Sequence, residues 1–382
     1  MAFRFPHFTS QKENSFLIFR IGKEEIDFLL FQKEISGVRI LAYGAESISY
    51  LNVRQTLEKI FTQLPQKENI RELIVTFSAS QFQAQGIQQT LPRSPSSHLI
   101  DRAEALLLEG EIRAKSSRVF QRILFQESGI LPGEFSLRKI KILERRIDGY
   151  PVPKFEGFKR GEIECSILGM FLLEIPFLPV EQFAKSHKIR NIRVLHIAEA
   201  IESLAKKRNQ EGVYLCVEEE KTQIALQKEG HFVFLGSISM GEDNFTEFFG
   251  HLLGMRETTA EAFQEQYFRG DLSQTMQEKV QTSLLPEIRK FGILIKKKLS
   301  SAKMVLPSFV WIFGKGRALR NIQYVFGNEE FEDLPFSQKP EVSFLLPKEV
   351  WEVKEFPGGN DPVYTTLCLL GFASESCESR TR

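Results

Sequence analysis

The first part of the chain alternates short apolar runs with charged or glycine-containing turns. Three strands are predicted over Leu17–Gly22, Ile26–Gln32 and Val38–Tyr43. Apolar residues then recur at helical spacing over Leu51–Leu64, and the apolar run Leu73–Phe77 predicts a further strand. The resulting order is three strands, a helix and a strand.

A similar order returns in the second half of the chain. The predicted strands are Ile192–Leu195, Val213–Val217, Thr222–Gln227, Phe232–Ser237, Ser308–Phe313 and the β-like residues 341–356. The predicted helices are Ala198–Ala205, Gly241–Leu253, 274–300, Arg317–Val325 and Asp361–Leu370. The recurrence of three strands, helix and strand indicates two related halves.

The block between these halves has a different character. Residues Gln81–Ser97 are polar and contain two prolines, which favours a loop or a long hairpin. Helical patterns follow over Leu99–Glu111 and Ser117–Gln126, and strands are predicted over Leu137–Ile147 and Gly161–Leu173. We interpret this block as a compact α/β insertion.

Composition narrows the class of protein. The 382 residues suffice for two domains or one bilobal domain, and 42% hydrophobic with 26% charged residues is typical of a globular protein. A net charge of +1 gives no basic field for nucleic acid, so no nucleic-acid partner is expected. No apolar run is long enough to span a bilayer, and the 34 phenylalanines are expected to fill a large core.

The cysteines and histidines do not form a recognisable site. The four cysteines lie far apart without CxxC spacing, and the six histidines contain no HExxH pair. We therefore expect no metal, no disulfide framework and a reducing cytosolic location. Cys216 lies in an apolar strand without a nearby histidine, which favours a core residue over a nucleophile.

Several segments resemble the FtsA family of actin-like cell-division proteins and, more distantly, PilM-like pilus-assembly proteins. They are Ile147-Asp-Gly-Tyr-Pro-Val152, Phe155–Gly161, Ile167–Phe171, Ser239–Thr246, Ala260-Glu261 and Asp361–Phe372. The resemblance implies an α/β, actin-like (ribonuclease H-like) bilobal fold with an inserted α/β subdomain. It places the first lobe at 1–77, the insertion at 78–175, the second lobe at 176–356, and a closing helix and polar tail at 357–382.

The resemblance also implies where nucleotide would bind, between two turns whose small residues let backbone amides reach phosphate. The first turn matches Arg20–Glu25, with Arg20 at the family's aspartate. The second matches Cys216–Thr222, with Cys216 at the other aspartate and three glutamates at the glycines. Some positions of this implied site keep the family's glycine, as at Gly22, and others are changed. The vestigial nucleotide-site positions are Arg20, Gly22, Lys23, Cys216, Glu218, Glu219, Glu220, Thr222, Gly241, Gln264, Gly314 and Gly316.

These changes predict that the nucleotide chemistry has been lost. A like charge about 4 Å from a phosphate is unfavourable by about 4 kcal/mol at an effective dielectric near 20. Loss of both aspartates removes the residues that organise magnesium. We expect a pseudo-ATPase with no catalytic residue, no metal and no ATP-Mg. Taken without the family, Glu218–Lys221 is typical of a solvated hairpin turn, and Gly314–Gly316 is more typical of a structural turn than of a phosphate loop.

The function implied by the resemblance is a non-catalytic scaffold in bacterial cell division that links FtsZ-type filaments to other division proteins. Self-association is a further expectation. The tail Ala373–Arg382 is polar, so we expect a cytoplasmic protein that reaches the inner face of the membrane only through a partner. The alternatives are a PilM-like cytoplasmic platform of pilus assembly or secretion, which captures a peptide from a membrane partner, and an actin-like ATPase with a rebuilt nucleotide site.

Overall fold

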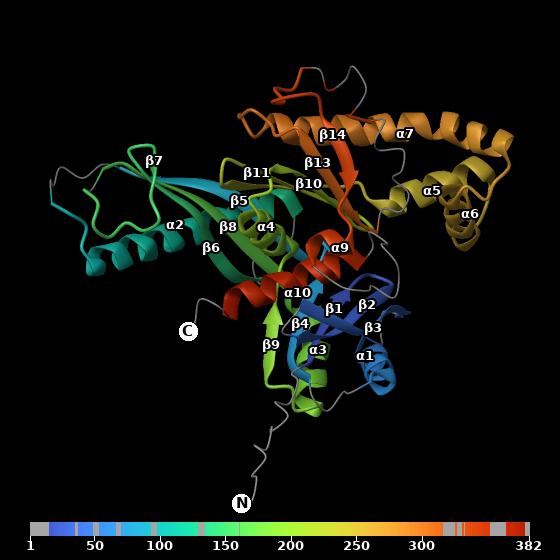
Figure 1. The fold of residues 1–382 in the computed structure, drawn as a ribbon, viewed down its shortest axis with the longest axis horizontal. Helices are drawn as coiled ribbons and strands as arrows, with labels where there is room; N and C mark the ends of the chain where they lie inside the picture. The colour runs from blue at the N-terminus through green and yellow to red at the C-terminus, as the bar shows by residue number, and fades with distance from the viewer. Residues whose placement is uncertain are drawn as a thin grey trace, which may run out of the picture.

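The computed structural model describes residues 15–34, 37–48, 53–65, 70–92, 98–128, 134–159, 161–315, 325–326, 331, 333–351 and 364–378. Within these residues the chain forms two five-stranded sheets and one four-stranded sheet (Figure 1). Gly316 lies outside the described residues, and so does the predicted helix Arg317–Val325 except for Val325.

The first sheet has the strand order β3-β2-β1-β4-β9. Its strands are β1 (Ser15–Ile21), β2 (Glu25–Glu34), β3 (Gly37–Ser47), β4 (Ile70–Phe77) and β9 (Asn191–Val194). The first three form an antiparallel meander, and β4 and β9 continue in parallel from β1. Helices α1 (Val53–Gln63) and α3 (Glu174–Ser186) pack against each other, with Phe61 against Phe183, and Phe183 also contacts Phe19 of β1.

The second sheet repeats this topology with the order β12-β11-β10-β13-β14. Its strands are β10 (Gly212–Val217), β11 (Thr222–Lys228), β12 (His231–Ile238), β13 (Phe309–Gly314) and β14 (Glu341–Phe344). Again three strands form an antiparallel meander and the last two run parallel to the first. The expectation of two related halves is therefore confirmed.

Each central strand is covered on both faces, which explains its continuous apolar sequence. In β10, Val213, Leu215 and Val217 belong to the core formed with α5 (Glu242–Leu253), α6 (Glu257–Arg269) and α7 (Gln274–Ser300). Tyr214 and Cys216 face the opposite core, as predicted for Cys216. That second core contains α4 (Ile197–Arg208) and α10 (Thr365–Glu378), which lie between the two five-stranded sheets (Figure 1).

The insertion lies between β4 and α3 and extends to one side of the molecule (Figure 1). It consists of β5 (Phe82–Leu91), α2 (Arg102–Ser128), β6 (Phe135–Ile147), β7 (Tyr150–Pro151) and β8 (Ile163–Leu173), with the sheet order β5-β8-β6-β7. Helix α2 packs on this sheet at Gly169, where a Cβ would lie 2.7 Å from the ring of Phe120. A glycine is needed for this close packing.

The base of the insertion contacts both halves of the molecule. Lys139 and Lys141 of β6 form ion pairs with Glu199 and Glu202 of α4. At β5, a Cβ on Gly86 would lie 2.4 Å from the carbonyl oxygen of Phe234 in β12. These contacts fix the insertion against the second sheet as well as the first.

A buried histidine lies at the same junction. His196 caps α4 by accepting a hydrogen bond from the Ala198 amide through Nδ1, and its Nε2 lies 3.1 Å from the Phe82 carbonyl oxygen. Burial lowers the pKa of His196 to about 3, and the ring is therefore neutral at physiological pH. With Nδ1 accepting, the proton is on Nε2, which donates to Phe82. This histidine has a structural role.

The fold corrects several sequence predictions. The strand near residue 192, assigned to the second lobe, is β9 and pairs with β4 in the first sheet. The two helices predicted over 99–126 are one helix, α2, and the polar segment after residue 81 contains a strand, β5. Helix α3 is not among the predicted helices, and it contains Pro179 within its span. In the described part of the β-like segment 341–356, strand β14 ends at Phe344 and the short helix α9 (Pro347–Val350) follows.

Candidate functional site

The candidate site lies where strands of the two halves end and face one another. The first turn joins β1 to β2, and the second, Glu218–Lys221, joins β10 to β11 and is closed by a hydrogen bond from the Glu218 amide to the Lys221 carbonyl. Lys315 follows β13, the parallel neighbour of β10. Because parallel strands end at the same edge of a sheet, Lys315 and the second turn lie together.

Arg20 is the central residue of this site. Its side chain is 3% exposed and its Nη1 donates to Asp27 Oδ2 at 2.8 Å. The guanidinium also forms a two-pronged contact with Glu219, with Nη1 3.0 Å from Oε1 and Nη2 bonded to Oε2. Burial alone would lower the pKa of Arg20, but the attraction of Glu219, Glu218 and Asp27 raises it well above its usual value. The arginine is permanently charged and joins the two halves.

Lys315 provides a second buried cation. Its Nζ lies 3.1 Å from Glu219 Oε1 and 3.5 Å from Asp27 Oδ2, and it forms an ion pair with Glu25. Glu25 and Asp27 come from β2 of the first half, whereas Lys315 and Glu219 come from the second half. Arg20 and Lys315 therefore form two bridges between the halves, with each cation contacting acids from both.

Glu218 is the most deeply buried carboxylate of the second turn. The Ala79 amide donates to its Oε2 at 2.8 Å, Gln223 Nε2 donates to its Oε1 at 3.2 Å, and Arg20 lies 3.8 Å away. Burial raises the pKa of Glu218 to about 7, even though Arg20 opposes this shift. At neutral pH this carboxyl is divided between its protonated and ionised forms.

Glu219 has the opposite balance. Burial raises its pKa, but the charge and hydrogen bonds of Arg20 outweigh this effect, and the net shift is downward. Its backbone carbonyl accepts the Asp243 amide at 2.9 Å, and the Glu218 carbonyl accepts the Glu242 amide at 2.9 Å. The second turn therefore occupies the first amides of α5 with its own carbonyls.

Gly241 permits this close approach of the turn to α5. A Cβ at Gly241 would lie 2.4 Å from the carbonyl oxygens of both Glu218 and Glu219. A side chain at this position would separate the turn from the helix. Glycine at this position therefore lets the turn pack directly against the start of α5.

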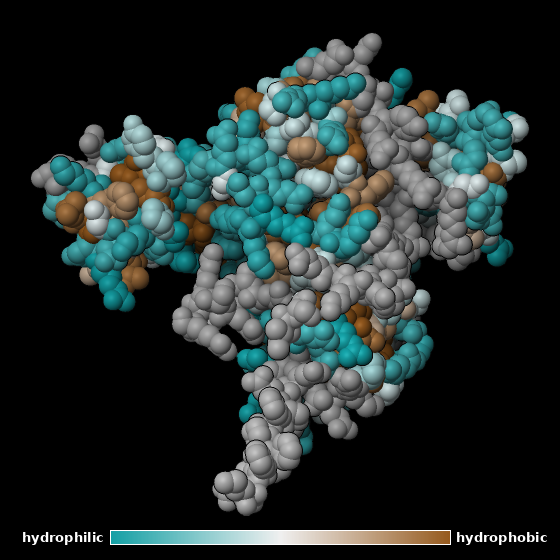
Figure 2. All heavy atoms as spheres, viewed as in Figure 1, coloured by the Kyte–Doolittle hydropathy of each residue, from teal (hydrophilic) through white to brown (hydrophobic). Residues whose placement is uncertain are grey.

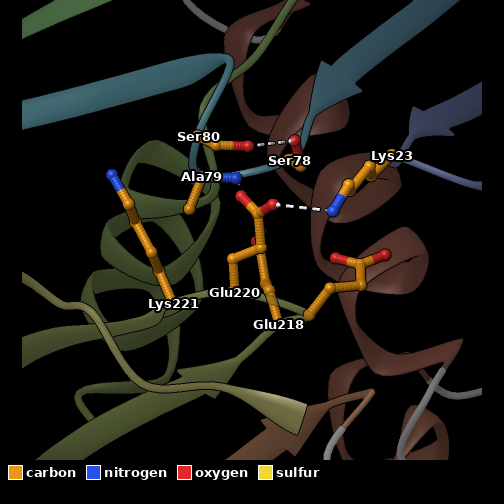
Figure 3. A pocket seen from close by; sticks show the side chains of 8 residues that line it. Lys23, Ser78, Ala79, Ser80, Glu218, Glu220 and Lys221 are labelled. Carbon is orange, nitrogen blue, oxygen red and sulfur yellow. Dashed lines mark hydrogen bonds and ion pairs between the residues drawn. The ribbon is translucent and has the colours of Figure 1, made fainter. Parts of the chain in front are cut away.

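Little space remains between the two turns (Figure 3). The pocket there has a volume of about 10 Å³ and is lined by Lys23, Ser78, Ala79, Ser80 and Glu218–Lys221. This is about the space of one water molecule, whereas pockets for small-molecule ligands measure about 300–1,000 Å³. Across its mouth, Lys23 lies 3.5 Å from Glu220, and Ser78 and Ser80 are hydrogen-bonded at 3.0 Å.

The remaining predicted positions lie around this network. A Cβ at Gly22 would lie 2.8 Å from Glu219 Oε1, and one at Gly314 would lie 2.3 Å from the Val217 carbonyl. Thr222 donates to the Met240 carbonyl, and Thr246 donates to Gln264 Oε1 at 2.6 Å, between α5 and α6. Gln264 therefore lies away from the turns. Gly316 is outside the described residues.

The glutamate turn is not the solvated hairpin that its sequence suggests in isolation. The side chains of Glu218, Glu219 and Glu220 are 4%, 15% and 37% exposed. Glu218 and Glu219 both lie near Arg20, whereas Glu220 pairs with Lys23 at the surface. Two of the three glutamates are therefore partners of a buried cation.

Sequence reasoning missed three members of the network, Glu25, Asp27 and Lys315, as charged partners. Asp27 had a detectable signal, because a lone aspartate in the apolar run Ile26–Phe31 is costly to bury without a cation. It lies opposite Arg20 in the β1–β2 register. Lys315 was considered only as part of a glycine turn.

The chemistry of this site is that of a closed ion-pair cluster. Two cations meet four carboxyl groups, from Glu25, Asp27, Glu218 and Glu219, so the cluster is not an anion-binding surface. Burial raises the pKa of Cys216, which makes its thiol a poor nucleophile. No group of three or more His, Cys, Asp or Glu residues within the described part of the chain is arranged to hold a metal ion.

The architecture is shared with solved structures. A chain of the PilM–PilN type IV pilus biogenesis complex aligns with a TM-score of 0.63 at 14% identity, covering 94% of this chain and 98% of that one. The fold is that of the actin-like ATPases. ADP-bound MreB5 of Spiroplasma citri aligns over 97% of this chain and 99% of its own, at 11% identity and a TM-score of 0.49. No protein-family model matches the chain, and neither does any curated protein sequence.

The actin-like expectation is thereby confirmed, while the specific resemblance to FtsA stays a prediction. No helix among the described residues is long and apolar enough to cross a membrane.

Proposed function

We propose that this chain is a non-catalytic scaffold that uses the actin-like fold as a rigid frame and acts as a PilM-type cytoplasmic platform in pilus assembly or secretion. The observation that carries the proposal is the Arg20–Glu219 bridge. It joins the two turns through buried side chains at the place where the fold's enzymes hold nucleotide. The pocket of about 10 Å³ beside it supports the same conclusion.

The proposal excludes binding of ATP-Mg. A triphosphate would have to separate Arg20 and Lys315 from the carboxylates that they bind in both halves. Its negative charge would then be repelled by those carboxylates. We expect no heat of ATP-Mg binding by isothermal titration calorimetry at millimolar nucleotide, and no turnover above background. A nucleotide-binding actin-like protein such as MreB is the positive control. Micromolar ATP binding would contradict the pseudo-ATPase assignment.

The insertion is proposed as the surface that contacts the partner. Its large exposed apolar residues include Leu106 and Leu107 of α2, 65% and 74% exposed, and Tyr150 of β7, 75% exposed. Hydrophobic side chains are visible on the surface of this part of the molecule in Figure 2. Neighbouring exposed apolar side chains such as Leu106 and Leu107 are typical of protein–protein contact sites.

The pilus-assembly and cell-division hypotheses predict different binding partners. PilM forms a complex with PilN, so the pilus reading expects binding of the PilN-type membrane partner from the same genome. The segment Gly149-Tyr150-Pro151-Val152, which resembles the FtsA insertion, favours division as the second candidate and expects binding of the FtsZ-type C-terminal peptide.

The partner test compares these two peptides by biolayer interferometry. We expect the PilN-type cytoplasmic peptide to bind. The double variant Leu106→Glu, Leu107→Glu should lower the affinity for this peptide at least about tenfold, because an introduced charge disrupts an apolar contact. Ile175→Glu, at an 82% exposed position on α3, is the matched control and should leave binding unchanged. Binding of the FtsZ-type peptide instead would move the assignment to division, and binding of neither would contradict both.

A further inference from the structure

A large pocket lies at the opposite end of β10 and β13 from the candidate site. It has a volume of about 670 Å³ and is formed by the residues between α4 and β10 and by those at the start of β13. The candidate site lies after Val217 and Gly314, whereas Glu211 and Phe309 line this pocket at the start of the same two strands. At about 3.3 Å per residue the two are roughly 17 Å apart. Its size is within the range of ligand pockets.

One wall of the pocket is a flat aromatic surface. The rings of Phe309 and Trp311 are stacked, with centroids 6.0 Å apart and planes inclined by 17°. Phe309 is 41% exposed, and the buried Pro307 continues the wall. Gly212 allows this arrangement, because a Cβ there would lie 2.5 Å from Trp311 Cδ1. The backbone of β10 is therefore shaped to receive the indole ring.

Polar groups at the pocket have unused hydrogen-bonding or charge capacity. The amide oxygen Oε1 of Gln210 is buried and has no hydrogen-bond partner among the described residues. The indole Nε1 of Trp311 has only a long contact, 3.5 Å, with the Glu211 carbonyl. A turn of Gln210 toward the pocket would offer an acceptor beside this donor. One donor and one acceptor together match a peptide group.

The charged residues that line the pocket are Arg208 and Glu211, and Glu211 Oε1 already accepts the Glu229 amide at 2.8 Å. Arg208 donates from Nη2 to the Val350 carbonyl at 3.1 Å, and within the described residues no carboxylate pairs with it. Lys206 is paired with Glu202 and Lys207 lies over the ring of Phe372, so Arg208 is the cation at the pocket. This charge favours a ligand that has a carboxylate next to the group that stacks on the aromatic wall.

We propose that this pocket binds an extended, proline-containing acidic peptide of a partner protein. Proline rings pack on flat aromatic surfaces, and the extended polyproline conformation leaves carbonyl groups free to accept from donors such as the Trp311 indole. Arg208 holds an Asp or Glu side chain beside the proline. The proposal is independent of what the candidate site and the insertion do, because it uses none of their residues.

The test uses a display library of random linear peptides about twelve residues long, selected against the wild-type chain. Bound peptides are then challenged with the double variant Arg208→Gln, Phe309→Ala. We expect selection of peptides with proline next to Asp or Glu, and we expect the double variant to bind them at least about tenfold more weakly in fluorescence polarisation. Tryptophan emission should change on binding, since Trp311 is partly exposed and Trp351, the other of the two tryptophans, is buried.

Matched variants separate a local effect from loss of folding. Arg122→Gln with Phe125→Ala changes the same residue types at exposed positions of α2 and should leave the affinity unchanged. Trp311→Phe keeps the aromatic wall but removes the indole donor, so it should weaken binding less than the double variant does while abolishing the change in emission. Selection of no binder, selection of peptides without proline and an acid, or equal binding by the double variant and wild type would each overturn the proposal.

Discussion

Replacement of Arg20 by alanine is expected to lower the free energy of unfolding by about 3–5 kcal/mol, the cost of breaking a buried ion pair. Asp27, Glu218 and Glu219 would lose the cation they share, in surroundings where an uncompensated charge is poorly tolerated. Lys315 does not take over these contacts, because it is already engaged with Glu25, Asp27 and Glu219. Urea unfolding followed by circular dichroism measures the loss.

The control is Arg39→Ala, at an exposed position of β3, for which a change within about 0.5 kcal/mol is expected. Adding Asp27→Asn to Arg20→Ala should restore part of the loss, because it removes one of the unpaired charges. The two substitutions are in direct contact, so their effects should not add. A loss below about 1 kcal/mol for Arg20→Ala would mean that the bridge between the halves contributes little.

On the proposal of a non-catalytic scaffold, this bridge gives a physical reason for an actin-like fold that binds no nucleotide. In the enzymes of this fold a nucleotide lies between the two turns, whereas here Arg20 and Lys315 connect the same elements from within the chain. A scaffold needs a fixed relation between its surfaces and gains nothing from opening. The ion pairs provide that relation without a bound molecule.

Much of the frame could be predicted from the sequence because its strands are covered on both faces. Continuous apolar runs such as those of β1 and β10 have no other stable location than the centre of a covered sheet. The repeated order of three strands, helix and strand then predicted two halves. The assignment of β9 failed because sheet membership depends on pairing with β4, more than a hundred residues earlier in the chain.

The location of the candidate site could be predicted from the sequence, but its ion pairs could not. Aligning Arg20 and Glu218–Glu220 with the two turns of the family placed them across one cleft. That alignment treated the glutamates as repelling charges facing an absent phosphate, whereas two of them are held by the arginine that replaces the family's aspartate. Helix α3 shows the same limit, because Pro179 is accommodated inside the helix only through packing that sequence patterns do not report.

The largest expected effect of pH comes from Glu218. Its pKa is about 7 in the folded protein and near 4.5 in an ordinary environment, a difference of about 3 kcal/mol at 1.36 kcal/mol per pH unit. Between these values the folded chain holds a proton that the unfolded chain has released, so stability falls as pH rises. Asp243, whose pKa burial raises to about 6, acts in the same direction. Glu219, with a lowered pKa, contributes stability that is lost only as pH falls below about 4.5.

Glu218→Gln isolates this contribution, since glutamine mimics the protonated carboxyl and can still accept from the Ala79 amide. We expect the variant to gain about 2–3 kcal/mol over wild type between pH 5 and pH 8, measured by urea unfolding across that range. Glu220→Gln, at the exposed end of the same turn, should change stability by less than about 0.5 kcal/mol and leave the Glu218 dependence in place. If Glu218→Gln and the wild type instead lost stability in parallel as pH rose, the proton on Glu218 would not be the cause of the pH dependence. A gain confined to Glu218→Gln would show that the ionised Glu218 carboxylate destabilises the closed cluster. This is the carboxylate that the Ala79 amide and Gln223 hold, with Arg20 3.8 Å away.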